Sequence, residues 1–393
     1  MLTLDHLLLA LTALSALYWL GAIVCVIAFG RRRPVAAGWT PPISVLKPLL
    51  RNDGRLYDNL RSFCEQDYPA FQVLFGVQDA HDQAIHTVDR LVKEFPHLDL
   101  RIVVNDRIIG PNRKISNVAN LCQEARHEIL VLADSDMRVG RDYLRAVVTP
   151  LQDESVGLVT CLYRSRPQPG LGATLAAMFV NEWFFPAVLV GARLQPLRHA
   201  FGATIACRRR TLAAIGGFEA VADYLADDYM LGSLMSQGGR RVVLSPYLVE
   251  NAGADRDLAS LFFRELRWTR TFRIVRPLSY FMSGITHGLP LSLLFLLSSG
   301  VSDLALTLGA VHLGLRGAGG RVVYWALGLP VPRGRLWLLP LRDSLSFLTW
   351  LLSFLGQSVR WNGRRLRVDV DGKLHPLPEA ASSPPHPSTS PQG

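Results

Sequence analysis

The chain has 393 residues, of which 49% are hydrophobic, and its mean hydropathy is +0.20. This is too apolar for an ordinary soluble protein and too polar for a pure bundle of membrane helices, so a catalytic domain with a few membrane spans fits best. The net charge of +10 does not point to a nucleic acid, because the sequence has no basic helix and no alternation of aromatic and basic residues.

Arginines cluster beside apolar runs instead, which suits contact with anionic lipid headgroups on a cytoplasmic face. The five cysteines are scattered along the chain, and no two of them have the spacing of metal ligands. We therefore expect a reducing compartment and no disulfide framework.

The first apolar run extends from about residue 7 to residue 30, has no charge after His6, and is long enough to span a bilayer. Arg31, Arg32 and Arg33 follow it directly. A signal peptide has its positive charges before the apolar run, so residues 1–33 are predicted to be a permanent anchor. The positive-inside rule places the N-terminus outside and the chain from residue 31 onward in the cytoplasm.

After a linker at residues 40–42, short apolar runs alternate with helical patterns. Strands are predicted at 43–46, 73–77, 100–104, 129–133 and 156–160, and helices at 59–64 and 114–125. Strands and helices that alternate at this spacing form βαβ units and a parallel sheet. The predicted fold class is therefore α/β.

Residues 171–194 are apolar but include Asn181, Glu182 and Pro186. Glu182 would be costly in the middle of a bilayer, and a full span would place the motifs that follow on the opposite side. The sequence favours a helix that lies in the membrane interface, and a second full span is the alternative.

Two further spans are predicted at 289–313, which Asp303 interrupts, and at 336–355. Arg342 and Asp343 lie near one end of the last span, and we expect them to pair with each other; a lipid-facing site is the alternative. With one span before the catalytic domain and two after it, the domain and the basic segment that follows the last span lie on the same side of the membrane. The tail from about residue 376 is rich in Pro and Ser and is predicted to be disordered.

Two carboxylates, Asp134 and Asp136, follow the strand predicted at 129–133. Ligands of open α/β sheets bind at the carboxyl ends of strands, so both side chains are expected at the rim of a pocket. Carboxylates with one residue between them can share Mg²⁺ or Mn²⁺, which would also bind phosphate oxygens. A simple turn or helix cap is the alternative.

Other polar segments also lie at element ends. Asp79 follows the strand at 73–77, where it can accept hydrogen bonds from a uracil or a ribose, or cap a helix. Arg113 and Lys114 begin a predicted helix, and cations near a helix N-terminus suit a phosphate. Lys114 and Asn117 share one helical face. A solvated basic turn is the alternative for this segment.

Asp227 and Asp228 precede an apolar run. They can provide a helix cap and a first-turn acid. They can also provide a general base, because two neighbouring carboxylates repel when both are ionised, and this raises the pKa of one of them.

Arg264, Arg267 and Trp268 lie just before the C-terminal membrane segment. The two arginines are three residues apart, on one helical face. Trp268 can pack beside a sugar or an acceptor. An interfacial belt of Trp and Arg is the alternative.

In this order and near this spacing, these residues resemble the ceramide glucosyltransferase family. The family pattern is Asp, Asp, Asp and (Gln/Arg)xxArgTrp, and it is matched by Asp79, Asp134, Asp228 and residues 264–268. Residues 46–49, 67–69, 114–117 and 216–217 also resemble family signatures. The similarity covers roughly residues 40–280.

The resemblance implies a GT-A fold, which is Rossmann-like with a mostly parallel sheet, and an inverting, metal-dependent glycosyltransferase. Asp79 would hold the uridine, Asp134 and Asp136 the metal, and Asp228 would be the general base. The remaining substrate-binding residues would be Arg113, Lys114, Asn117, Asp227, Arg264, Arg267 and Trp268.

The animal ceramide enzymes have Asp-Ser-Gly where this chain has Asp134, Ser135 and Asp136. In this respect the chain is similar to bacterial relatives such as the hopanoid-biosynthesis-associated glycosyltransferase. The similarity implies transfer of N-acetylglucosamine to a hopanoid polyol by a multi-pass protein of the bacterial cytoplasmic membrane. The expected donor is UDP-GlcNAc or UDP-glucose, and a ceramide glucosyltransferase proper is the alternative.

The expected organisation is an anchor at 1–33, a cytoplasmic domain at 40–280 with its interfacial helix at 171–194, membrane helices at 285–360, a basic segment at 361–375 and a tail at 376–393. A processive polysaccharide synthase shares the motifs, but two spans after the domain are too few to line a channel. A non-catalytic scaffold of the same fold would have lost some of the acids. The sequence leaves the lipid, the sugar and the oligomeric state open.

Overall fold

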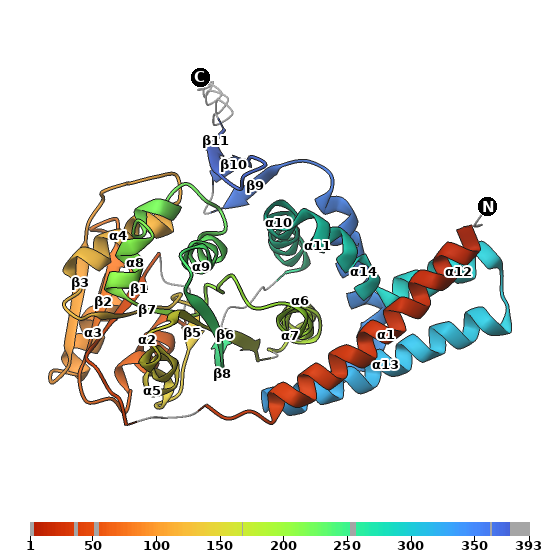
Figure 1. Ribbon diagram of the computed structural model, residues 1–393, viewed down its shortest axis with the longest axis horizontal. Coiled ribbons are helices and arrows are strands. Elements are labelled where there is room, and N and C mark those ends of the chain that lie inside the picture. The colour runs from red at the N-terminus through yellow and green to blue at the C-terminus, as the bar shows by residue number, and fades with distance from the viewer. Residues whose placement is uncertain are drawn as a thin grey trace, which may run out of the picture.

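A computed structural model describes residues 4–34, 38–50, 55–166, 168–251, 257–361 and 364–377. An α/β unit forms one end of the molecule, and a helical bundle projects from the other (Figure 1). Most of the predicted tail, residues 378–393, lies outside the described residues.

One eight-stranded sheet, in the order β3-β2-β1-β4-β7-β6-β8-β5, organises the α/β unit. The first four positions are parallel: β3 (Asp99–Val104), β2 (Phe71–Val77), β1 (Ile43–Pro48) and β4 (Ile129–Leu132). β7 (Ile205–Arg208) is antiparallel to β4 and β6 (Val156–Ser165), β6 is parallel to β8 (Arg241–Asn251), and β5 (Met137–Arg138) is antiparallel to β8. All five predicted strands are therefore confirmed, and β1, β2 and β4 end at the same edge.

Helices cover both faces of the sheet. On one face α2 (Leu56–Cys64), α3 (Ala84–Glu94), α5 (Tyr143–Val148) and η1 (Thr149–Gln152) bury alternate strand residues such as Val45. On the other face α4 (Arg113–Glu124), α8 (Arg209–Ala214), η3 (Glu219–Val221) and α9 (Asp227–Gln237) bury the intervening residues such as Leu46. Burial on both faces explains why the strands are continuous apolar runs.

Beyond the sheet, a segment of three helices lies between the α/β unit and the bundle: α6 (Leu171–Met178), the π-helix η2 (Phe179–Phe184) and α7 (Phe185–Leu194). Its most apolar stretch is long and apolar enough to cross a membrane, and 67% of that stretch is buried within the protein. Packing against the rest of the chain therefore accounts for much of its apolar composition. An interfacial position stays a prediction.

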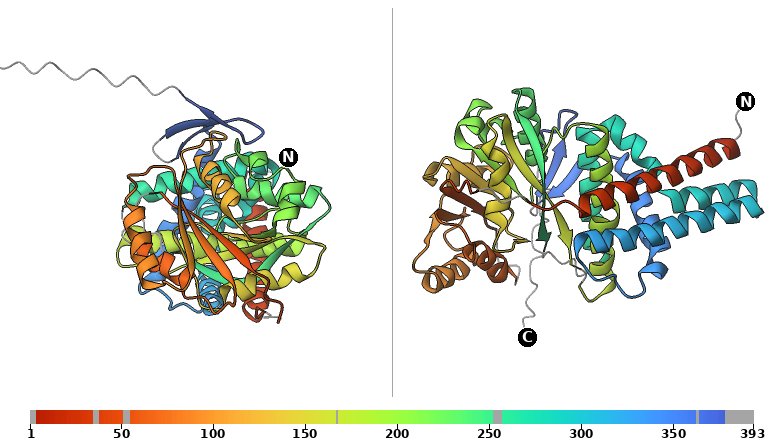
Figure 2. Two further views of the ribbon diagram at one scale, coloured as in Figure 1. Left: turned by 90° about the vertical axis from the view of Figure 1, so that its left-hand side faces the viewer. Right: turned by 60° about the horizontal axis from the view of Figure 1, so that its bottom comes forward.

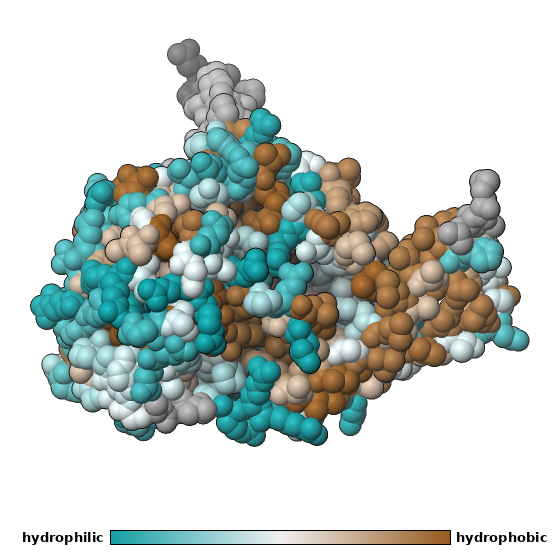
Figure 3. All heavy atoms as spheres, viewed as in Figure 1, coloured by the Kyte–Doolittle hydropathy of each residue, from teal (hydrophilic) through white to brown (hydrophobic). Residues whose placement is uncertain are grey.

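Apolar helices form the projecting part of the molecule. α1 (Leu4–Gly30) runs beside α13 (Asp303–Leu327) and α12 (Gly288–Ser299), as two views agree (Figures 1 and 2). Exposed leucines such as Leu7, Leu14 and Leu17 contribute to the hydrophobic surface seen there (Figure 3). By length and composition, α1 and residues 171–194 can cross a membrane, and a third span is possible if the bent pair Pro277–Thr286 and Gly288–Ser299 counts as one.

The predicted continuous span at 289–313 is wrong. α12 ends at Ser299 because Gly300 adopts a positive φ of 79°, which glycine alone adopts readily. A new helix, α13, then begins at Asp303, where the Ser302 hydroxyl accepts a hydrogen bond from the Ala305 N–H at 3.3 Å.

The remaining helices are α10 (Leu258–Val275), α11 (Pro277–Met282), η4 (Ser283–Thr286) and α14 (Arg335–Ser353). Buried ion pairs join the helical elements: Glu182 pairs with Arg335 and, at 4.0 Å, with Arg316, Asp343 pairs with Arg316, and Glu265 pairs with Arg342. The predicted pairing of Arg342 with Asp343 is therefore wrong. Successive residues of a helix point about 100° apart, so each side chain meets a different neighbouring helix.

Replacing Arg342 with leucine should lower the free energy of unfolding by about 3 kcal/mol, because the fully buried Glu265 carboxylate loses two charge-assisted hydrogen bonds of 2.8 and 2.6 Å. Thermal unfolding in detergent measures this. Arg210→Leu is the matched control, since its pair with Glu128 is exposed and contributes little. Equal stability of the two variants would show that the buried pair is unimportant.

A second sheet occupies most of the predicted basic segment: β9 (Ser358–Trp361), β10 (Arg364–Val368) and β11 (Leu374–Pro376). The Leu374 N–H donates to the Asp223 carbonyl at 2.7 Å, and the Leu225 N–H donates to the Gly372 carbonyl at 3.1 Å. On the other side, Arg270 of α10 donates to the Ser358 carbonyl at 2.7 Å. The small sheet thus holds α10 and the loop before α9 together.

Candidate active site

A cavity of about 1090 Å³ opens at the carboxyl ends of β1, β2 and β4 and continues between α7, α10 and α11. This is at the upper end of the range for small-molecule sites, so it has room for two substrates. Ten of the predicted site residues line it: Asp79, Arg113, Lys114, Asn117, Asp134, Asp136, Asp227, Asp228, Arg267 and Trp268.

The carboxylates after β4 are fixed by groups from other strands. Lys47 of β1 donates to the backbone carbonyl of Asp134 at 2.6 Å, and Asn251 of β8 donates to Asp136 Oδ2 at 2.9 Å. Burial and the neighbouring Asp134 raise the pKa of Asp136 to about 6. Burial also lowers the pKa of Lys47 to about 7, although both carboxylates oppose this shift.

These two carboxylates fit a divalent cation. Burial and mutual repulsion both destabilise the charged form of such carboxylates, and a bound cation offsets both effects. Among the described residues no group of three His, Cys, Asp or Glu side chains is arranged to hold a metal. Mg²⁺ is commonly held by one or two carboxylates, with substrate phosphates and water as the other ligands, so Asp134 and Asp136 are sufficient protein ligands.

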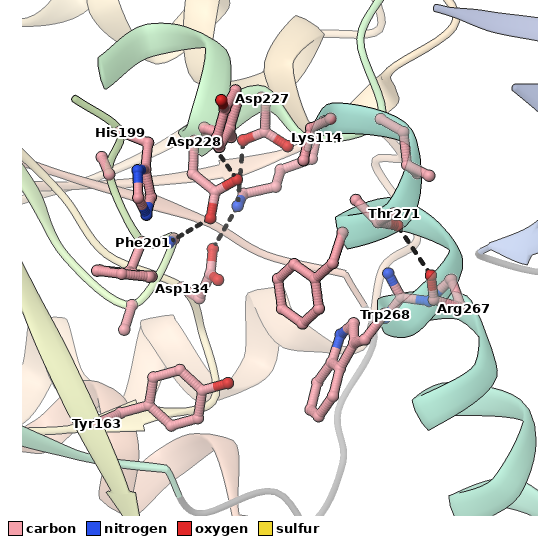
Figure 4. Close-up of a pocket in the computed structure, with 18 of the residues that line it drawn as sticks. Lys114, Asp134, Tyr163, His199, Phe201, Asp227, Asp228, Arg267, Trp268 and Thr271 are labelled. Carbon is pink, nitrogen blue, oxygen red and sulfur yellow. Dashed lines mark hydrogen bonds and ion pairs between the residues drawn. The ribbon is translucent and has the colours of Figure 1, made fainter. Parts of the chain in front are cut away.

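Lys114, at the start of α4, lies among three carboxylates (Figure 4). Its Nζ is 2.7 Å from Asp134 Oδ1 and 3.5 Å from Asp227 Oδ2. Burial alone would lower the pKa of Lys114, but Asp134 and Asp227 outweigh it and raise the pKa. Lys114 is therefore a fixed positive charge at the centre of the site.

Asn112 positions this helix and Asp227 together. Its Oδ1 accepts from the Ile115 N–H at 3.1 Å and so caps α4, while its Nδ2 donates to Asp227 Oδ1 at 3.2 Å. Asp227 does not cap its own helix, because Ala226 is the N-cap of α9 and no side chain caps there. The alternative in which Asp227 is a helix cap is therefore wrong, and both acids lie in the first turn of α9.

Asp228 accepts hydrogen bonds from two backbone N–H groups, those of Gly202 and Tyr229, both at 2.7 Å. Burial and the charge of Asp227 raise the pKa of Asp228 to about 6, as expected for adjacent carboxylates. A Cβ at Gly202 would lie 3.1 Å from Asp134 Oδ2 and 3.4 Å from Asp228 Oδ2. Both acids therefore converge on this glycine.

At the β2 end, the predicted residues differ in their surroundings. Asp79 Oδ1 accepts from the His81 N–H at 2.8 Å in a turn that borders the cavity. The Asn117 amide is buried and donates to the Gly76 carbonyl at 2.8 Å, so it fixes the end of β2. Arg113 is exposed at the cavity edge.

α10 contributes Arg267 and Trp268, which face the carboxylates across the cavity (Figure 4). The Trp268 ring stacks on Phe179, with 5.9 Å between ring centroids, and the Arg264 guanidinium lies 4.8 Å from the Trp268 ring centroid. Arg264 is not among the residues that line the cavity. Burial and Arg264 lower the pKa of Arg267.

Sequence reasoning missed several residues of the site: Lys47, Tyr163, His199, Gly202 and Asn251. Lys47 offered a signal, because a lysine inside an apolar strand is unusual. His199 lines the cavity stacked on Tyr229, at 5.2 Å, and burial and Arg276 lower its pKa to about 4. It is therefore a neutral imidazole, and its loop gives no sign of this in the sequence.

Comparison with known proteins agrees with this arrangement. The family model described as glycosyl transferase family 21 matches residues 7–374. Ceramide glucosyltransferase 1 of Caenorhabditis elegans is 27% identical over 231 residues, covering 58% of this chain and 49% of that protein. The ceramide glucosyltransferase of Komagataella phaffii is 27% identical over 148 residues, covering 33% of this chain and 28% of that protein. The chain thus spans about half the length of the Caenorhabditis elegans relative and a smaller share of the Komagataella phaffii relative.

Among solved structures, a mannosyltransferase from Pyrobaculum calidifontis in complex with GDP-Man and Mn²⁺ superposes with a TM-score of 0.55 and 19% identity, covering 90% of this chain and 99% of that one. At this identity the likeness concerns the fold, and it confirms the predicted GT-A class. Since the family model spans nearly the whole chain, this protein belongs to glycosyl transferase family 21 and is related to the ceramide glucosyltransferases.

Proposed function

We propose that the protein transfers one sugar from a UDP-sugar to a hydroxyl group of a membrane lipid. One observation carries the proposal: a single cavity has six aspartates at one end and apolar side chains from candidate membrane helices at the other. A charged, hydrophilic donor and an apolar acceptor can both bind in such a cavity. The named activity of the relatives, sugar transfer to ceramide, also supports it.

The donor occupies the sheet end of the cavity. Asp79 accepts hydrogen bonds from the uridine, and Arg113 lies where it can pair with the phosphates. Asp134 and Asp136 would hold Mg²⁺ or Mn²⁺, which would supply positive charge against the diphosphate as it leaves. Lys114, already cationic, adds to this positive potential. UDP-glucose and UDP-GlcNAc are the two donors we propose.

Asp228 is the general base. Its carboxylate accepts the proton of the acceptor hydroxyl while that oxygen forms its bond to the anomeric carbon. The bond from the anomeric carbon to the diphosphate oxygen breaks in the same displacement, and UDP leaves. One displacement inverts the anomeric centre and requires no enzyme nucleophile. The raised pKa of Asp228 makes it a stronger proton acceptor than an ordinary aspartate.

Two acceptor classes are compatible with this chemistry. Ceramide is the acceptor in the names of the relatives, whereas the Asp134-Ser135-Asp136 sequence favours a bacterial hopanoid polyol. Membranes containing the protein should be incubated with UDP-glucose or UDP-GlcNAc and with each lipid, and the extracted lipids analysed by mass spectrometry. We expect one lipid to gain the mass of one sugar. No glycolipid from any combination would contradict the proposal.

The cytoplasmic membrane of a bacterium is the proposed location, with the catalytic domain inside. Because three arginines follow α1, reporter fusions after Arg33 and after Arg276 should both be active as cytoplasmic reporters and inactive as external ones. A fusion after Gly21, inside α1, is the control for membrane insertion. If the two reporters lie on opposite sides, residues 171–194 cross the bilayer and the predicted orientation is wrong.

A further inference from the structure

The cavity continues away from the carboxylates as a slot between α7 and α11. On the α7 side it is lined by Ala187, Val188, Gly191 and Ala192, and on the other side by Val275, Ser279, Tyr280 and Ser283. The spacing of four residues places the first set on one face of α7. The second set comes from three consecutive elements: Val275 ends α10, Ser279 and Tyr280 lie on α11, and Ser283 begins η4. Five of these eight residues are alanine, glycine or serine, so the two walls face each other across small side chains. The cavity lining here also includes the charged Arg276, between Val275 and Ser279.

The helices that form the slot are among those apolar enough to lie in a membrane. α7 belongs to the candidate span at 171–194, and α11 belongs to the bent pair whose two halves meet at 68°. Large apolar side chains next to the slot are exposed, among them Leu194 (77%), Leu278 (74%) and Phe281 (60%). Exposed apolar groups on both sides of an opening are typical of contact with lipid.

The inner end of the slot meets the candidate catalytic site. Trp183 is held there by a 3.0 Å hydrogen bond from its Nε1 to Thr286 Oγ1, and it stacks on Phe179, which stacks on Trp268. These aromatic rings and the carboxylates of Asp228 and Asp134 line the same cavity. A molecule in the slot can therefore reach the proposed base without leaving the protein.

We propose that this slot binds the hydrocarbon chain of the acceptor lipid, which enters sideways from the bilayer while its hydroxyl group reaches Asp228. The proposal rests on the function given above and names where the acceptor binds. A chain that moves from lipid into an apolar slot gains little from the hydrophobic effect, because both surroundings are apolar. Selection of the acceptor then depends on whether the chain fits between the two helices.

Filling the slot from either wall tests this. A Cβ at Gly191 meets no atom within 4 Å, so Gly191→Phe can be accommodated, and Ser279→Phe fills the slot from the opposite helix. Gly314→Phe is the matched control, since Gly314 is also open and exposed but lies on α13, away from the cavity. The acceptors are ceramide, as a long-chain lipid in phosphatidylcholine vesicles and as a short-chain, water-soluble analogue, and a hopanoid polyol in the same vesicles.

We expect both slot variants to transfer sugar to the long-chain lipid about tenfold more slowly than the control, because the phenyl ring and the hydrocarbon chain compete for the same space. Transfer to the short-chain analogue and binding of UDP should stay as in the control. If long-chain and short-chain acceptors are affected equally in both variants, or not at all, the slot does not hold the chain. Absence of any product with the unmodified protein would instead contradict the proposed function.

Discussion

Replacing Asp228 with asparagine should lower the rate of sugar transfer to lipid by about 10²–10⁴, because an amide cannot accept the proton of the acceptor hydroxyl. Asparagine keeps the size of the side chain, and its Oδ1 can still accept one of the two hydrogen bonds from the N–H groups of Gly202 and Tyr229. Binding of the UDP-sugar should therefore be retained. Turnover and nucleotide binding are to be measured on the same membranes at equal protein levels.

Asp227→Asn is the matched control. Asp227 faces Lys114 and Asn112, and it acts on Asp228 through its charge. Its replacement should lower the pKa of Asp228 and slow transfer less than Asp228→Asn does. If Asp227→Asn is the less active enzyme, or if Asp228→Asn no longer binds the donor, Asp228 is not the base.

Asp134→Ala should slow transfer by about 10³-fold or more, since it removes one of the two proposed metal ligands and with it a contribution of several kcal/mol to stabilising the diphosphate. An excess of a metal chelator should have a similar effect on the unmodified protein, and added Mn²⁺ or Mg²⁺ should reverse it. The fold should persist, because Lys114 keeps its contact with Asp227.

Asp89→Ala, an exposed carboxylate on α3, is the control for a general loss of acidic charge and should leave transfer unchanged. Transfer that survives both Asp134→Ala and the chelator would contradict the metal role. If the chelator abolishes transfer by the unmodified protein and added Mn²⁺ or Mg²⁺ does not restore it, the metal role is also contradicted.

Local patterns in the sequence were sufficient for the α/β unit. Each strand is a short apolar run buried on both faces, and polar residues follow where the strand ends, so Asp79 and Asp134 were placed at one edge before the structure was known. Asp228 was placed at the start of a helix for a similar reason. These features depend on near neighbours in the chain.

Features that depend on distant segments could not be predicted. Asn251 reaches Asp136 across 115 positions of sequence, and Arg342 pairs with Glu265 across 77. No local pattern reports such contacts. The break at Gly300 was not predicted, because the run 289–313 stays largely apolar on both sides of Asp303. Gly300 after one helix, and Ser302 before Asp303, are nevertheless signals for a helix end and a new helix start.

The anomeric configuration of the product tests the account most directly. After transfer from a UDP-sugar, which carries its sugar in the α configuration, NMR of the purified glycolipid should show one sugar in β linkage. This result follows from one displacement with Asp228 as the base and no enzyme nucleophile. An α-linked sugar would contradict that mechanism, and a chain of several sugars would contradict the transfer of a single residue.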